Sequence, residues 1–301
     1  MSFNNHYLRD ITVKFVLAGV AVLLVGAHTS VPAQKKKSVS STTTGPLLTR
    51  TISRHEVRRF GYGGTITVVG APRGSITIEG WSKNEVDVIA EIEVQAATEE
   101  DLARLAAVNG FALDDDVNHL NLLTTGMHDK SYMRRAAKGF PKQLLGLPWK
   151  IDYRLRVPVN TELEINGGVG PINLSGVEGA VRLSAPQTDA TLTLTGGSMT
   201  ATIASGTVNV RVSSRSWRGS GVDIKLAAGE LNLELPTGFS GDIDADILGV
   251  GKIENSYPGL ESREKPGLGE KIVRGRAGSG GAFLKFTVGA GSIRIMKSPQ
   301  N

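Results

Sequence analysis

The chain has 301 residues, of which 40% are hydrophobic and only 5% aromatic, and 37 are glycine. This composition is that of a folded protein with a core of small aliphatic side chains, not of a disordered one. Cysteine is absent, which excludes disulfides, thiolate zinc sites, iron–sulfur clusters and cysteine nucleophiles. The formal net charge of +5 is a mild excess, without the concentrated basic face and stacking aromatics expected of a nucleic-acid-binding protein.

Residues 1–33 have the pattern of a secretory signal peptide. Arg9 and Lys14 precede an uncharged apolar run at 15–27, and small residues at 31–33 offer a cleavage point. An uncleaved membrane anchor is the alternative, but the run is shorter than the ~20 residues that span a bilayer comfortably. We therefore expect an exported protein that is periplasmic, displayed on the outer surface or secreted.

Residues 34–58 are expected to form a flexible linker rich in lysine, serine and threonine. The stretch QKKKSVSSTTTG at 34–45 has scarcely any apolar residue. It cannot bury enough surface to offset the entropy lost on ordering.

Residues 59–127 predict an N-terminal region of β-strands. In EVDVIAEIEV, at 85–94, apolar residues alternate with mostly charged ones, so one face is buried and the other solvated. A helix over 99–109 interrupts the strands, because Thr98 and Asp101 make a start that resembles a capping box and an apolar stripe follows. We expect this helix to cover one end of the strand array.

Residues 128–148 form a basic insertion loop that fits no strand period and has room for one helical turn. Its candidate binding residues are Lys130, Tyr132, Arg134, Arg135 and Lys138. These could engage an anionic polymer or membrane surface by Coulomb attraction and aromatic contact. Alternatively, the leucines at 144, 145 and 147 dock on the strands and the basic residues are merely solvated. We favour docking, because exposed leucine clusters are unusual on soluble proteins.

Residues 149–297 repeat a short unit in which a turn residue, usually glycine, precedes alternating apolar positions. Examples are GPINLSG at 170, GAVRLSA at 179, GTVNVRV at 206, GELNLEL at 229 and GSIRIMK at 291. Each strand has one apolar stripe that it can bury only by stacking on the next coil, while glycine permits a positive φ or a close backbone approach at the corners. The predicted fold is an all-β β-solenoid with one short helix, two irregular insertions at 128–148 and 255–280, and a tail at 298–301.

Two long segments carry a resemblance to a known family. They are FGYGGTITVVGAPRGSITIEGWSKNEVDVIAEI and YRLRVPVNTELEINGGVGPINLSGVEGAVRLSAPQTDATLTL. Both resemble the bacterial putative-adhesin family of β-strand-repeat domains of unknown function, and the resemblance extends over residues 60–296. It implies an exported or envelope-exposed β-solenoid and brings no catalytic residues with it.

Residues that could support chemistry are few and have simpler explanations. Asp242, Asp244 and Asp246 imitate the start of a calcium loop, but strand alternation predicts that they line the solvent face, and the downstream glutamate ligand is missing. Glu230 and Glu234 could serve a polysaccharide-active β-helix enzyme, although a solubilising strand face explains them as well. We expect no catalytic residue, no cofactor and no metal.

The sequence thus predicts a non-enzymatic, adhesin-like binding module. Its expected partners are an envelope polysaccharide, an anionic membrane surface or another protein. Two alternatives remain open: a self-associating structural or envelope-stress-related protein, because unpaired strand edges invite pairing, and, ranked lower, a polysaccharide-active enzyme.

Overall fold

A computed structural model describes residues 46–299, apart from 71, 117 and 265–267. The expected signal peptide at 1–33 and the linker segment at 34–45 lie outside the described residues. So do the last two residues of the expected tail at 298–301. No helix in the described part of the chain is long and apolar enough to cross a membrane.

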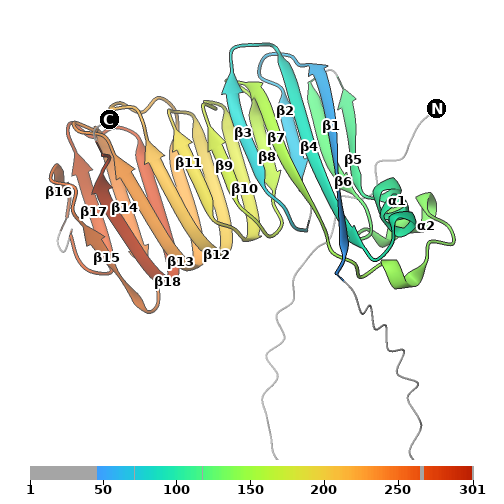
Figure 1. The fold of residues 1–301 in the computed structure, drawn as a ribbon. Helices are drawn as coiled ribbons and strands as arrows, with labels where there is room; N and C mark the ends of the chain where they lie inside the picture. Colours follow the sequence, from blue (N-terminus) through green and yellow to red (C-terminus); the bar gives the residue numbers. More distant parts are fainter. Residues whose placement is uncertain (1–45, 71, 117, 265–267, 300–301) are drawn as a thin grey trace, which may run out of the picture. The chain divides into compact units, whose positions relative to one another are not determined.

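The described chain is all-β, as predicted, and its strands join one sheet that curls as an open half-barrel (Figure 1). The strands are β1 (Leu48–Arg59), β2 (Thr65–Val69), β3 (Ile76–Trp81), β4 (Glu85–Ala96), β5 (Gly110–Asp116), β6 (His119–Thr125), β7 (Trp149–Pro158), β8 (Glu162–Asn166), β9 (Ile172–Ser175), β10 (Ala180–Gln187), β11 (Ala190–Leu194), β12 (Ser198–Val212), β13 (Gly221–Leu235), β14 (Gly241–Ile247), β15 (Gly251–Asn255), β16 (Leu260–Ser262), β17 (Ile272–Ala277) and β18 (Phe283–Lys297). The helices are α1 (Glu99–Val108), α2 (Lys130–Ala136) and the 3₁₀ turn η1 (Lys142–Leu144).

Most strands pair in parallel within two ladders. The first ladder has the order β6-β2-β8-β10-β12-β13-β18-β14, and the second has the order β7-β3-β9-β11-β12-β13-β18-β15. Strands β12, β13 and β18 are long enough to contribute one half to each ladder. The core lies on the inward faces of these ladders.

The register explains why the repeat folds as it does. Each inward apolar residue stacks on its counterpart in the next strand. In the first ladder one such row is Ile66, Leu163, Val181, Met199, Val222, Leu284 and Ile243, all of them buried. Stacking in register hides the stripe that no single short strand could hide.

Glycine occupies the corner where the long strands bend from one ladder into the other. A Cβ built on Gly229 would lie 1.9 Å from the carbonyl oxygen of Gly206, and one on Gly291 would lie 1.8 Å from that of Gly229. The φ angles of Gly229 and Gly291 are 140° and 139°, values that other residues rarely adopt. The predicted role of glycine at the corners is confirmed.

Strand order departs from chain order at two places, which the sequence did not predict. Strand β18 lies between β13 on one side and β14 and β15 on the other (Figure 1). Likewise, β2 and β3 lie between β6 and β7 on one side and β8 and β9 on the other. Long-range pairing therefore completes both regions of the sheet.

Part of the expected linker at 34–58 is wrong. Its residues from 48 onward form β1, which pairs antiparallel with β4 from Leu48–Ala96 to Arg59–Glu85. None of the side chains of β1 is buried, so its sequence lacks the apolar face that marks a strand. The edge of β4 supplies the hydrogen bonds that order it.

The helix expected at 99–109 is confirmed as α1. The Asp101 amide donates to Thr98 Oγ1 at 3.1 Å, and Leu102 and Leu105 are buried where the helix packs against β4 and β1. Two irregular regions hold more structure than expected, because α2 and η1 lie in the 128–148 insertion, and β16 and β17 lie in the 255–280 insertion.

Candidate functional site

The basic insertion is organised around the start of α2. Asp129 caps this helix, because its Oδ1 accepts hydrogen bonds from the amides of Ser131 at 2.7 Å and Tyr132 at 3.0 Å. The bond from the Tyr132 amide, helped by that from Ser131, holds the pKa of Asp129 below its ordinary value. The cap fixes where the helix begins and therefore which side chains it presents to solvent.

The apolar residues of the insertion dock against the strands. Met133 and Leu144 are buried, and Tyr132, Phe140 and Leu147 pack against the core. Leu145 alone of the three leucines stays largely exposed, at 44%. Tyr132, which was expected to contact a partner, is half-buried, and its side chain packs against the protein's own core.

The four predicted cations of the insertion, Lys130, Arg134, Arg135 and Lys138, are all exposed. Within the described residues none of them has an acidic partner within ion-pair distance, and Arg134 only donates to Ser131 Oγ at 3.3 Å. Several cations on the strand faces are paired, for example Arg211 with Glu234 at 2.7 Å. We call the four residues the basic face; its positive charge is not compensated by direct ion pairs.

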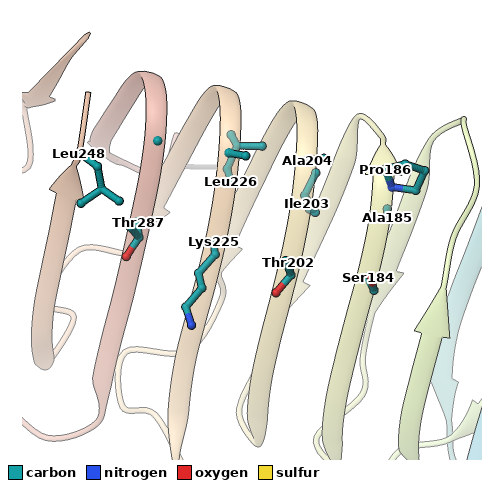
Figure 2. Close-up of a pocket in the computed structure, with 12 residues that line it drawn as sticks. Ser184, Ala185, Pro186, Thr202, Ile203, Ala204, Lys225, Leu226, Leu248 and Thr287 are labelled. Atoms are coloured by element: carbon teal, nitrogen blue, oxygen red, sulfur yellow. The ribbon is translucent and has the colours of Figure 1, made fainter. Parts of the chain in front are cut away.

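A second candidate site is an apolar groove that sequence reasoning missed (Figure 2). It has a volume of about 650 Å³ and crosses β10, β12, β13 and β18 on their outward side, with Leu248 beyond the end of β14. Its residues are Ser184, Ala185, Pro186, Thr202, Ile203, Ala204, Lys225, Leu226, Ala227, Leu248, Thr287 and Gly289. We call this feature the corner groove, because it runs beside the glycine corner.

The geometry of the corner groove follows from a recurring tripeptide of small residues. Ala-Ser-Gly at 204–206, Ala-Ala-Gly at 227–229 and Gly-Ala-Gly at 289–291 occupy the same place in successive strands. With no large side chain at the first position of each, the outer surface is hollowed along the ladder. These tripeptides are visible in the sequence, but small residues before a glycine are also typical of ordinary turns and therefore did not indicate a groove.

The aspartates of β14 do not line the solvent face, so that expectation was wrong. The returning segment of β16 and β17 places Arg263, Arg274 and Arg276 over them. Arg276 binds Asp242 through two hydrogen bonds of 2.7 and 3.1 Å, Arg263 binds Asp244, and Arg274 binds Asp246 at 2.7 Å. The side chains of Asp242, Asp244 and Asp246 are only 13%, 14% and 17% exposed.

The local electrostatics fit an internal ion-pair cluster. The hydrogen bond from Arg276 is the main cause that holds the pKa of Asp242 below its ordinary value. Burial raises the pKa of Asp244 against the pull of Arg263 and Arg274. Guanidinium groups stand where a calcium ion would need open carboxylates, and within the described ranges no group of three or more His, Cys, Asp or Glu side chains is placed to hold a metal.

The two glutamates considered for polysaccharide chemistry lie on the outward face of β13. Glu230 pairs with Arg294 at 3.2 Å, and Glu234 pairs with Arg211 at 2.7 Å, each across to a neighbouring strand. Neither lines the corner groove. Cross-strand charge pairs of this kind support the sheet, and the structure does not bring the two carboxylates together over a cleft.

Comparison with known proteins gives similarity at the level of structure. No family model matches the chain, and no curated protein matches it by sequence. The structure is similar to that of a putative cell adhesion protein from Clostridium sporogenes ATCC 15579, with a TM-score of 0.42 and 13% identity, over 82% of this chain and 100% of that one.

Two further solved structures are similar over nearly the same span. A putative adhesin from Bacteroides fragilis NCTC 9343 has a TM-score of 0.31 and 14% identity over 83% of this chain and 97% of that one. A putative lipid binding protein from Parabacteroides distasonis ATCC 8503 has a TM-score of 0.27 and 14% identity over 82% of this chain and 97% of that one. Two of these three proteins are named for cell adhesion or as an adhesin.

Proposed function

We propose that this protein is an exported, non-enzymatic binding module that holds an anionic polysaccharide of the cell envelope on its basic face. The observation that carries the proposal is the set of four exposed cations on and beside α2 that, within the described residues, lack an acidic partner at ion-pair distance. An anionic polymer would supply the missing countercharges. Attraction of this kind raises the local concentration of a polyanion and weakens as salt is added.

A polysaccharide fits this face better than a membrane does. A helix that inserts into a lipid interface exposes apolar side chains beside its cations. Here Met133 and Leu144 are buried and Tyr132 packs inward. Leu145 is the one leucine of the insertion that is largely exposed, so the face offers charge with little apolar surface. Contact by charge and hydrogen bonding suits a hydrated, charged polymer.

The scaffold suits a binding role because it is rigid and repetitive. We infer that the two parallel ladders are two faces of a β-solenoid, since Leu163, Val181 and Met199 stack in register at a constant 18-residue interval. Function on such a scaffold resides in the irregular segments attached to it. Export is supported by the signal-peptide pattern at 1–33, and the non-enzymatic assignment by the ion pairs that occupy Glu230 and Glu234.

Binding to an immobilised polyuronate tests the proposal. A variant that changes Lys130, Arg134, Arg135 and Lys138 to alanine should lose binding. The matched control changes four other cations to alanine. These are Arg154, Arg215, Arg218 and Lys297, which are exposed and also have no ion pair within the described residues. The two variants have the same net charge, so a loss confined to the first assigns binding to the basic face.

Salt and surface type give two further readouts. Binding of the natural chain should weaken steeply between 50 and 200 mM salt, roughly tenfold or more for four contacts of this kind. Equal binding by both variants would contradict the proposal. Selective binding of the natural chain to phosphatidylglycerol vesicles, with none to the polyuronate, would show that the partner is a membrane instead.

A further inference from the structure

We infer that the corner groove is a binding site for one extended saturated acyl chain with an anionic headgroup. This inference does not depend on the proposed function, because the groove and the basic face share no residue. The groove's shape, its lining and its single charged residue each support it.

The shape of the groove fits a straight, narrow occupant. It crosses from β10 past β12, β13 and β18 to Leu248 after β14. Four strand spacings of about 4.8 Å give a length on the order of 19 Å. Ala204, Ala227 and Gly289 keep the floor open along this path, as Figure 2 shows for Ala204 between Pro186 and Leu226. Its volume of about 650 Å³ lies within the range of small-molecule sites.

The lining excludes occupants that need many hydrogen bonds. Strands β10, β12, β13 and β18 pair on both sides in the ladder, so their backbone groups are already bonded to one another. A peptide or a sugar lying along the groove could bond only to the row of side chains at Ser184, Thr202, Lys225 and Thr287. Its other donors and acceptors would be buried without partners, which is costly. A hydrocarbon chain has no such groups and gains from each methylene it buries.

The charge at the rim selects the headgroup. Among the residues that the structure describes, Lys225 is the only charged one that lines the groove. It stands in a row with Ser184 on β10, Thr202 on β12 and Thr287 on β18. Its acidic neighbour Asp223 is 3.9 Å away and 39% exposed. An ammonium and three hydroxyls beside an apolar floor match a carboxylate or phosphate attached to a chain.

The test is displacement of a dansyl-labelled fatty acid from the purified full chain. Affinity should rise about fourfold per added methylene along the series octanoate, decanoate, laurate and palmitate, and level off once the groove is filled. Ala204→Trp should weaken laurate binding about tenfold or more, since it keeps two or more methylenes from being buried. Thr200→Trp is the matched control, because Thr200 is exposed on the same strand and does not line the groove.

Lys225→Gln separates the headgroup from the chain. This variant should bind laurate more weakly and bind uncharged dodecanol as well as the natural protein does. The inference is overturned if no acid in the series binds, or if Ala204→Trp and Thr200→Trp bind alike. It is also overturned if light scattering shows concentration-dependent association that only Ala204→Trp abolishes, because the groove would then receive a second copy of the chain.

Discussion

Individual glycines at the corner are required for the close packing of neighbouring strands. The corner is built by backbones that approach one another so closely that a methyl group has no space, since a Cβ on Gly229 would stand only 1.9 Å from the Gly206 oxygen. Such a residue is fixed by the neighbouring strand and not by its own turn. Glycine frequency in the sequence indicated corners, but only the structure shows which of them are in contact with the next strand.

We expect Gly229→Ala to destabilise the protein by about 3 kcal/mol or more, through strain at a positive φ and displacement of the Gly206 backbone. Gly146→Ala is the control, because a Cβ placed on Gly146 would have no heavy atom within 4 Å. It should change stability by less than about 0.5 kcal/mol. Urea denaturation followed by circular dichroism measures both, and equal midpoints would refute the close contact.

At the scale of single elements, the insertion at 128–148 was predicted in part. The sequence left open whether the basic residues at 128–148 bind a partner or the leucines dock on the strands. The structure shows docking through Leu144 and Leu147, with the cations exposed. The helix itself was harder to foresee, because α2 spans only Lys130–Ala136. Its cap residue Asp129 and its packing against the core stabilise it, more than its own propensity does.

Removing the anchor should loosen the basic face without altering its charge. Leu144→Ala should cost about 2–5 kcal/mol, because Leu144 is buried. Leu145→Ala, at a side chain 44% exposed, should change stability by less than about 0.5 kcal/mol. Hydrogen exchange over 128–148 would rise in the first variant only. Similar exchange in both would mean that the insertion does not depend on docking.

At the scale of the whole molecule, the sequence predicts where the strands are but not the order in which they pair. The alternation in segments such as GELNLEL predicted strands and their buried faces, because a period of two is written in neighbouring residues. The same alternation does not indicate which strand pairs with which. Nothing in the sequence of β18 shows that it pairs with β13 as well as with β14, since these strands present the same kind of apolar stripe. The corner groove was missed for the same reason, because it exists only once strands are aligned.

Strand β18 should be indispensable although it comes last. Its residues Leu284, Phe286, Val288, Ile293 and Ile295 are fully buried. Burying five such side chains contributes roughly 7–15 kcal/mol, which is comparable to the entire net stability of a typical domain. A chain that ends at 281 should therefore fail to fold cooperatively, whereas one that ends at 298 should melt as the full chain does. Calorimetry distinguishes the two outcomes.

Strand β1 forms an edge of the sheet at which a second copy of the protein could pair. Among the described strands it pairs only with β4, and it carries Arg50, Arg54, Arg58 and Arg59 along its length. If a second copy added its own β1 at this margin, two arginine-rich strands would face each other, and like charges opposed in a sheet repel. Ion pairs with Glu99 and Glu56 offset part of this charge, but β1 keeps four arginines against one glutamate. We therefore expect edge-to-edge pairing at this margin to be disfavoured, more so at low salt.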